Sequence, residues 1–344
     1  MSELRINNIT DRAGSSGPII AGVSTVTSTS HMVMPSGPTE MRGGRGRGFF
    51  HGGRNNPNHY SDINLITIAS AGNATDFGDM SIKRNGPGGN ASSSTRALAA
   101  GGYSIAASAT VNSIDYFIMS SSGGTNDFGD LSEIANSFGG VSNNSRGIFG
   151  GFYPSYSGAL SFVTIASTGD ASDFGSLLER ADVIGGINSP TRGIFSGMSV
   201  SPVAEGSASL VSRTEFVSIT SLGNSQEFGN LSVTRNAVGG SSSSTRGLVS
   251  GGLTPSLSDV IDFCTIATLG DFTDFGNLSV ARRSGASCSS STRGIHGAGT
   301  TPTNLNTIDF VTIASAGNAT DFGDMTYAAR GVAANSDVHG GLAQ

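Results

Sequence analysis

Apolar and polar side chains alternate over residues 307–315, in the way expected of a β-strand with one buried face. A stretch of small residues (285–289) and a short Thr-Arg-Gly-Ile-His-Gly segment (292–297) precede it, separated by glycine- and serine-rich turns. A turn of Ala, Gly and Asn then leads into the triplet Asp-Phe-Gly at 321–323 and a last short strand. Residues 284–330 therefore predict four short β-strands in succession.

The same pattern recurs along the chain with a period close to 50 residues. The triplet begins at Asp76, Asp127, Asp173, Asp274 and Asp321, and Glu227 begins a sixth version. The steps between these positions are 51, 46, 54, 47 and 47 residues. A module of this length cannot bury its apolar face alone, so successive modules must pack on one another.

Four short strands at a fixed period predict the blade of a β-propeller. The outer strand and the Arg-Gly segment that opens the second strand both occur six times, whereas the small-residue inner strand precedes only five of these segments. We predict the sixth inner strand at residues 331–336. The expected fold is all-β: a six-bladed propeller over residues 41–344, closed in a three-plus-one manner by the C-terminal strand. Residues 1–40 lie outside the period and predict an extended N-terminal arm.

The amino-acid composition fits a β-propeller and argues against one class of function, nucleic-acid binding. Glycine accounts for 51 of 344 residues and apolar residues for 36%, which suits short strands, glycine turns and a crowded centre. Low-complexity disorder is the alternative, and β-branched runs such as residues 308–313 argue against it. Only 13% of residues are charged, the net charge is −6, and Lys83 is the single lysine. We therefore predict no general nucleic-acid binding.

The chain has no apolar run near the ~18 residues that a membrane span requires, so we predict none. Cys264 and Cys288 occupy different repeat positions, which argues against a disulfide scaffold. The five histidines lack metal-ligand spacing, and His51 and His296 are offset by one strand position, so they should face opposite sides. No Ser-His-Asp or Cys-His set recurs, although a fold could still assemble one. We predict no catalytic residue, metal site, cofactor or enzymatic activity.

Two sets of charged residues recur with the repeat and predict structural roles. In the triplet, the acid is expected to cap turn N–H groups, the Phe to pack between neighbouring modules, and the Gly to adopt a backbone angle that other residues resist. Each second strand opens with an arginine: Arg47, Arg96, Arg146, Arg192, Arg246 and Arg293. We call the acid that begins each triplet the turn acid. A further set, Arg84, Arg235 and Arg282, follows it by eight residues.

Three functional motifs resemble parts of this pattern, but we favour the structural roles over each of them. The metal-binding Asp-Phe-Gly of protein kinases is needed once, with a placed lysine, whereas the triplet here recurs. The Asp-box turn of sialidases carries an aromatic residue where Met80, Leu131 and Leu278 stand. Residues 41–49 look like an RNA-binding arginine-glycine segment, but their final Arg-Gly aligns with the second strand of every other repeat.

The loop between the second and third strands differs in every repeat. A rigid frame with divergent loops on one face predicts a binding platform, and Tyr beside Ser, Gly and Asn suits adaptable recognition of sugars or protein surfaces. The alternative, that these loops diverge because nothing constrains them, stays open for each loop. The candidate ligand-binding residues are His59, Tyr60, Tyr103, Tyr153, Tyr156, Thr254 and Thr301, beside a long insert at 198–212.

The order of elements resembles the kelch repeat. The second strand ends in a Gly-Gly pair (150–151, 251–252), the third carries an Ile-Asp-Phe core (261–263), and Phe stands where kelch proteins usually have Trp. Residues 7–12 (Asn-Asn-Ile-Thr-Asp-Arg) and 14–18 are similar to the start of virion proteins from T4-like tailed phages of marine cyanobacteria. That resemblance implies a structural protein of the virion, in the tail, fibre, baseplate or head decoration.

The leading hypothesis is a non-enzymatic virion protein. Its arm (1–40) docks to other virion proteins, and its propeller presents a face to a host-surface glycan or protein or to a neighbouring subunit, with a homo-oligomer left open. The alternative is a carbohydrate-active propeller enzyme that acts on host envelope glycans. A soluble intracellular kelch interaction module is a third hypothesis, which the arm disfavours.

Overall fold

The computed structural model describes residues 46–182, 185–201 and 208–342. Within these ranges the regular secondary structure consists of β-strands in small antiparallel sheets, without a helix. The predicted all-β class is confirmed. The predicted N-terminal arm, residues 1–40, lies outside the described residues.

Six sheets follow the six sequence repeats, and we number them 1 to 6. In pairing order, sheet 1 is β31 (Ala333–Ser336), β1 (Arg47–His51), β4 (Asp62–Thr67) and β5 (Thr75–Asp79); sheet 2 is β7 (Arg96–Ala100), β10 (Ser113–Ile118) and β11 (Asn126–Asp130); sheet 3 is β12 (Gly139–Ser142), β13 (Arg146–Phe152), β14 (Ser157–Thr164) and β15 (Ser172–Ser176). Sheet 4 is β17 (Gly185–Asn188), β18 (Arg192–Ser196), β21 (Arg213–Ser218) and β22 (Gln226–Asn230); sheet 5 is β23 (Gly239–Ser242), β24 (Arg246–Ser250), β25 (Val260–Thr265) and β26 (Thr273–Asn277); sheet 6 is β27 (Ala286–Ser289), β28 (Arg293–Gly297), β29 (Leu305–Thr312) and β30 (Thr320–Ala329).

Sheet 1 combines the first and the last strand of the described chain. β31 pairs antiparallel with β1, with Gly48 opposite Ser336 and His51 opposite Ala333. On its other side β1 pairs with β4. The C-terminal segment therefore supplies the inner strand of the sheet that begins at Arg47, as its sequence position predicts.

Sheet 2 departs from the four-strand pattern. The predicted inner strand before Arg96 contributes only isolated bridges, Gly88 to Ala100 and Ser92 to Ala97. Pro87 lacks a backbone N–H, and Asn90 has a positive φ of 62°, so the chain here cannot hold continuous strand geometry.

Three smaller sheets contain residues of the loops that follow the second strands, and in two of them the loop pairs with the end of the preceding sheet. They are β2 (Arg54–Asn55) with β3 (Asn58–His59); β6 (Arg84–Asn85) with β8 (Tyr103–Ser104) and β9 (Ala109–Thr110); and β16 (Ala181–Asp182) with β19 (Ser199–Val200) and β20 (Ser209–Leu210). The sequence pattern predicts loops at these positions. The pairing gives part of these variable loops a fixed backbone.

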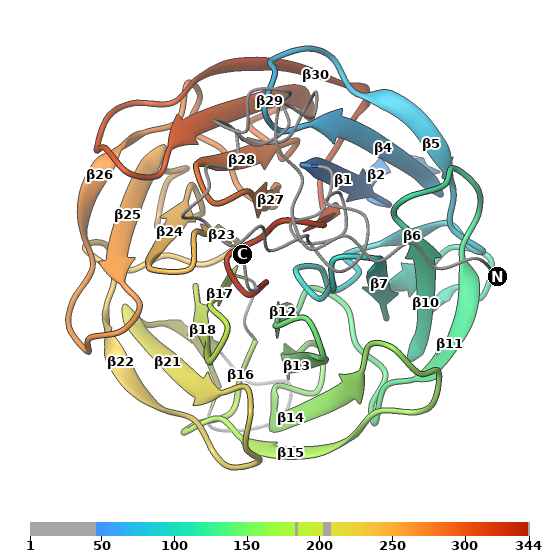
Figure 1. Cartoon of the computed structure of the whole chain (residues 1–344), viewed down its shortest axis with the longest axis horizontal. Helices are drawn as coiled ribbons and strands as arrows, with labels where there is room; N and C mark the ends of the chain where they lie inside the picture. Colours follow the sequence, from blue (N-terminus) through green and yellow to red (C-terminus); the bar gives the residue numbers. More distant parts are fainter. Residues whose placement is uncertain (1–45, 183–184, 202–207, 343–344) are drawn as a thin grey trace, which may run out of the picture. The chain divides into compact units, whose positions relative to one another are not determined.

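Within residues 46–342 the six sheets are arranged around a common centre, with β12, β17, β23 and β27 nearest to it (Figure 1). Small side chains suit this position because neighbouring inner strands contact each other. Serine hydroxyls link these strands: Ser336 donates to the carbonyl of Ser289 (2.7 Å) and Ser289 to that of Ser242 (2.8 Å). In the same way Ser92 donates to the carbonyl of Ser336 (2.9 Å).

The residues that follow β31 pack against these inner strands. His339 is buried, and its Nε2 lies 2.9 Å from the carbonyl oxygen of Ser92. The N–H of Gly340 donates to the carbonyl of Ser242 at 3.1 Å. The segment 337–342 thus bonds to strand β23 and to the innermost segment of sheet 2.

The apolar core lies between adjacent sheets. Phe49 of sheet 1, for example, packs edge-on against Phe77 of its own sheet (4.9 Å between ring centroids) and Phe117 of sheet 2 (5.2 Å). All three side chains are almost fully buried. A single sheet could not bury these rings, so the stability of each sheet depends on its neighbours.

Candidate functional site

The loops after the second strands meet the segments after the fourth strands at one end of the sheets, which we call the loop face. At each contact between consecutive sheets, which we call a junction, the residue nine positions after the turn acid pairs with a loop residue of the next sheet. From junction 1/2 to junction 6/1 these pairs are Asn85–Tyr103, Asn136–Tyr153, Asp182–Ser199, Asn236–Leu253, Arg283–Thr300 and Arg330–Arg54.

Some of the predicted binding residues come together on the loop face. The rings of His59 and Tyr103, from sheets 1 and 2, lie 6.0 Å apart. Tyr60 stacks on Tyr327 with 4.2 Å between ring centroids. Tyr153 and Tyr156 form a separate edge-to-face pair (5.6 Å) in the loop of sheet 3.

Thr254 and Thr301 hold their own turns. The Oγ1 of Thr254 accepts the N–H of Ser256 (3.1 Å) and donates to its carbonyl (3.1 Å). The Oγ1 of Thr301 makes the same two bonds to Thr303, at 3.3 and 3.2 Å. A structural role therefore accounts for both hydroxyls.

The turn acids Asp76, Asp127, Asp173, Glu227, Asp274 and Asp321 are all exposed. Among the described residues the predicted cap is present at Asp76 alone, whose Oδ1 accepts the N–H of Gly78 at 3.2 Å. Side chains in the turn between the third and fourth strands of the next sheet do the capping instead. Asn73, Asp170, Asn224, Asp271 and Asn318 each accept a backbone N–H from the preceding sheet, at 2.9–3.1 Å. The recurring Gly-Asn or Gly-Asp before the triplet is the sequence signal for this role.

The other two residues of the triplet have the predicted environments. Its Phe is buried in all six sheets and packs against apolar residues of the next sheet, as Phe322 does in one cluster with Ile66 and Ile68. Its Gly has φ between 142° and 159° in all six. A Cβ there would lie no more than 2.5 Å from a backbone atom of the next sheet, so only glycine fits.

The arginines that open the second strands connect each sheet to the next. In order, Arg47, Arg96, Arg146, Arg192, Arg246 and Arg293 donate to the carbonyls of Met119, Ile165, Ile219, Ile266, Ile313 and Ile68, at 2.5–3.2 Å. Five of them also lie 4.6–4.8 Å above an aromatic ring of their own sheet. These contacts fit the predicted structural role.

The second arginine set forms buried ion pairs. Arg84, Arg235 and Arg282 are fully buried and pair with Asp115 (2.6 Å), Asp262 (3.1 Å) and Asp309 of the next sheet. Arg84 also donates to the carbonyl of Gly101 (2.9 Å), and Arg282 to that of Thr307 (2.8 Å). Burial lowers the pKa of all three guanidinium groups, and the paired carboxylates oppose that shift.

The remaining three junctions replace this pair. The position of the buried arginine is taken by Ala135, Ala181 and Ala329, and the third-strand aspartate by Ser161, Glu215 and Asn64. Of these only Glu215 is an acid, and Arg213 of its own strand pairs with it at 3.0 Å.

A further hydrogen bond crosses every junction, whichever pair is present. The residue five positions after the turn acid donates to the third-strand polar side chain of the next sheet or, at junction 2/3, shares a hydrogen bond with it. The six pairs are Ser81–Asp115, Ser132–Ser161, Leu178–Glu215, Ser232–Asp262, Ser279–Asp309 and Thr326–Asn64.

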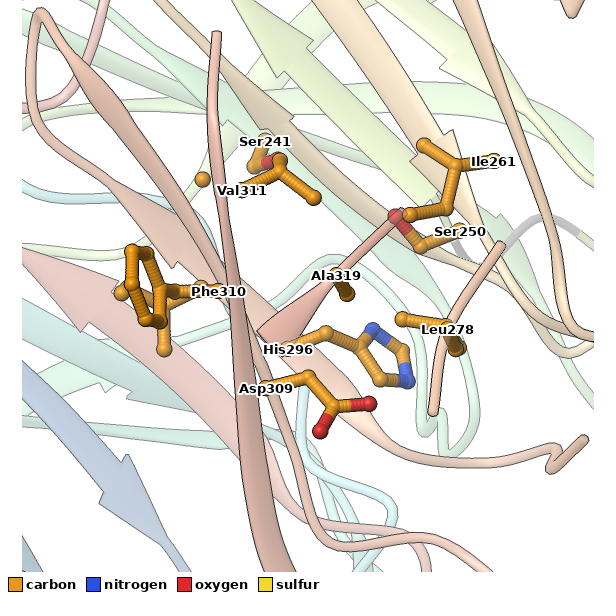
Figure 2. Close-up of a pocket in the computed structure, with 11 residues that line it drawn as sticks. Ser241, Ser250, Ile261, Leu278, His296, Asp309, Phe310, Val311 and Ala319 are labelled. Atoms are coloured by element: carbon orange, nitrogen blue, oxygen red, sulfur yellow. The ribbon is translucent and has the colours of Figure 1, made fainter. Parts of the chain in front are cut away.

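Figure 2 shows a small pocket between sheets 5 and 6 in which His296 and Asp309 lie close together. The Nδ1 of His296 bonds to Ser287 Oγ at 2.7 Å, but the Asp309 carboxylate is held by Ser279 and Arg282. Burial, with Arg282 nearby, holds the pKa of His296 well below its usual value. The free space is about 10 Å³, enough for one water molecule. This group therefore has the residue types of a hydrolase but neither the relay nor the room for a substrate.

Other buried histidine and cysteine side chains also have shifted pKa values. Burial lowers the pKa of His51 to about 3 and that of His339 to about 4, and raises that of Cys264 to about 12. His51 faces sheet 2, 6.0 Å from the Phe117 ring, whereas His296 faces sheet 5, so their predicted opposite orientation is confirmed. Across the described ranges no group of three or more His, Cys, Asp or Glu could hold a metal ion.

No protein-family model matches this chain, and no curated protein matches it. In the part of the chain that the structure describes, no helix has the length and apolar character to cross a membrane.

Proposed function

We propose that this chain is a non-enzymatic structural protein of a phage particle. Residues 41–344 form a six-bladed β-propeller of kelch-like repeats, and its loop face binds a host-surface glycan or protein or a neighbouring subunit. Residues 1–40 dock the propeller to other virion proteins. The similarity of residues 7–18 to phage virion proteins supports the particle assignment.

Three series of contacts support a ring of six blades because each continues from sheet 6 back to sheet 1. Arg293 donates to the carbonyl of Ile68 at 3.0 Å, as the other strand-opening arginines do in their junctions. Thr326 donates to Asn64 at 2.9 Å. A Cβ on Gly323 would lie 2.5 Å from the backbone of Gly72. A ring closed in this way leaves no inner sheet edge for unwanted pairing.

One observation carries the functional proposal: the contacts of the strand-opening arginines and of the triplet glycine repeat at all six junctions, whereas the loop face differs in every repeat. Most interior groups that could do chemistry are hydrogen-bonded, ion-paired or buried with shifted pKa values. Partly exposed side chains that could meet a ligand gather at the loops, such as Tyr103 and the Tyr153–Tyr156 pair. A rigid frame with varied loops is the arrangement of a binding platform.

Two measurements test this proposal: the location of the chain in the phage particle, and its activity on host cells. A density map of the intact particle should contain the six-sheet ring with its loop face exposed or against a neighbouring subunit. The purified chain should bind host cells without releasing reducing sugar from their polysaccharide. Release of reducing sugar would favour the carbohydrate-active enzyme instead, and absence of the chain from particles would contradict the proposal.

The arm and the ring are tested separately by truncation. A chain that begins at Met41 should fold but fail to join the particle, and its incorporation at normal copy number would move the docking surface to the ring. Removal of residues 331–344 should give insoluble protein because the inner edge of β1 loses its partner. A soluble, cooperatively unfolding product would contradict the three-plus-one closure.

A further inference from the structure

Junction 6/1 places two arginines directly opposite each other on the loop face. Arg54 and Arg330 form an antiparallel bridge: the N–H of Arg54 donates to the carbonyl of Arg330 (2.9 Å), and the N–H of Arg330 to that of Arg54 (3.1 Å). Side chains at directly opposite positions of such a pair leave the backbone on the same side. Both side chains are half-buried and remain accessible to solvent.

Arg283 of junction 5/6 adds a third positive charge. Its neighbour Ser284 accepts the N–H of Gly331, the residue after Arg330, at 2.8 Å. Burial lowers the pKa of Arg330, and the charges of Arg54 and Arg283 lower it further. None of the three guanidinium groups forms an ion pair with a carboxylate of the described residues.

This arrangement is unfavourable for the protein alone. Like charges directly opposite each other destabilise a β pair, and none of the other five junctions has them. The corresponding positions carry asparagine at three junctions and a single aspartate, Asp182, at junction 3/4. A bound anion would turn the repulsion into attraction, because guanidinium groups bind carboxylate and sulfate oxygens through paired hydrogen bonds.

The residues around the three arginines indicate which class of ligand would bear the anionic group. His59 lies opposite Arg54 in the β2–β3 pair, is nine-tenths buried, and its Nδ1 has no partner; nor has Arg54 Nε. Tyr60, whose N–H bonds to the carbonyl of Gly53, adds an aromatic ring stacked on Tyr327, and Tyr103 lies beside His59. Polar donors beside partly exposed aromatic rings suit a sugar ring with an acidic substituent.

We propose that Arg54, Arg283 and Arg330 form a binding site for the carboxylate or sulfate group of an acidic saccharide, with His59 and the Tyr60–Tyr327 stack beside it. This rests on the proposed function, and it gives the loop face a ligand class. The shared chemistry is an oxyanion on a sugar, whether a uronic acid or a sulfate ester.

The experiment measures binding of the full chain to three probes by calorimetry: oligogalacturonate for carboxylate, dextran sulfate for sulfate ester, and neutral dextran. At least one acidic probe should bind, with an affinity that falls as salt rises, and neutral dextran should not. The double variant Arg54→Gln/Arg330→Gln should lose about tenfold or more in affinity. The matched control Arg180→Gln, which removes one exposed arginine near junction 3/4, should change affinity less than about twofold.

A second readout does not depend on the ligand. At low salt without acidic probe, Arg330→Gln should raise the melting temperature, because it relieves the repulsion, whereas Arg180→Gln should not. The proposal is overturned if no acidic probe binds, if neutral dextran binds equally well, or if the double variant binds as the unmodified chain does. Host-cell binding, measured separately, distinguishes failure of this site from failure of the proposed function.

Discussion

Junctions 4/5 and 2/3 solve the same packing problem with different side chains. At junction 4/5 the buried Arg235 reaches Asp262, and Gly252 in the facing loop leaves room for its side chain. At junction 2/3 the three corresponding positions are Ala135, Ser161 and Phe152. There Phe152 fills the space in one apolar cluster with Ala135 and packs against Phe138 at 5.4 Å.

The other junctions follow one of these two arrangements, except that junction 6/1 keeps glycine, Gly53, in the facing loop. Junctions 1/2 and 5/6 combine arginine, aspartate and glycine, as junction 4/5 does. At junction 3/4, Met198 packs in one cluster with Ala181, and at junction 6/1, Tyr327 packs with Ala329. Where the buried arginine is replaced by alanine, a bulky side chain packs beside that alanine. A junction therefore does not require a buried ion pair.

The largest expected effect is the loss of one partner from a buried pair. Arg282→Ala leaves Asp309 buried without its counter-charge, and the free energy of unfolding should fall by about 3–5 kcal/mol. Urea unfolding followed by circular dichroism measures this difference.

The control variant removes both charges of the pair but adds no bulky side chain in their place. Arg282→Ala combined with Asp309→Ser, the residue types of junction 2/3, should recover a substantial part of the loss, because no carboxylate stays buried and unpaired. If the single and double variants lost the same stability, lost packing rather than unpaired charge would explain the difference between the two kinds of junction.

Junction 3/4 gives an intermediate case, because its acid is paired from its own strand. Arg213→Ala leaves Glu215 buried without its counter-charge, although the hydrogen bonds from Leu178 and Ser225 remain. Arg213 is also 19% exposed, so water can replace part of the interaction. We expect a loss of about 1–3 kcal/mol by urea unfolding. A loss as large as that of Arg282→Ala would show that exposure does not distinguish these junctions.

The loop-face position of junction 3/4 carries Asp182, where three other junctions have asparagine. Burial raises the pKa of Asp182 to about 6, although hydrogen bonds from Ser199 oppose the shift. The folded protein therefore holds this proton more tightly than the unfolded chain, and the resulting stability is present below about pH 4 and lost as pH rises through about 6. Asp182→Asn should abolish this dependence and stabilise the protein at pH 7 by about 1–2 kcal/mol. An unchanged pH profile of the melting temperature would contradict the assignment.

The smallest effect is expected for a turn acid outside the junction pairs. Asp274 is exposed and caps no turn in the structure, so Asp274→Ala should change stability by less than about 0.5 kcal/mol. A loss above about 1 kcal/mol in thermal unfolding would restore the capping role that its sequence position suggests.

Much of this frame could be predicted from the sequence because it recurs. The spacing of the triplets predicts the repeats. Only five inner strands precede a second strand, so the sixth, which pairs with β1, is expected at residues 331–336. Comparison of the repeats would also pair the buried residues: arginine follows the acids at 76, 227 and 274 by eight positions, and the following repeat then has aspartate at 115, 262 or 309. Glycine is exchanged for Phe152 or Met198 at two of the three junctions that lack that arginine, whereas junction 6/1 keeps Gly53.

The candidate binding site could not be predicted in this way, because it depends on features that occur once. Arg54 and Arg330 are far apart in sequence, and their proximity depends on the register of one bridge between sheets 6 and 1. The hydroxyls of Thr254 and Thr301 are polar in sequence, but only the turn geometry shows that they are used internally. Loop residues carry no periodic signal, so their roles follow from the fold alone.

The pairing of β1 with β31 has a consequence for how the protein is made. The bond from Arg47 to Asp337 joins residues 290 positions apart. A ribosome that adds about 5–20 residues per second needs roughly 15–60 s to synthesise the intervening chain. During that interval the inner edge of β1 lacks the strand that will cover it. Where many copies are translated close together, β31 of a finished neighbour could reach that edge first, so the last strand to be made is also the element best placed for domain swapping.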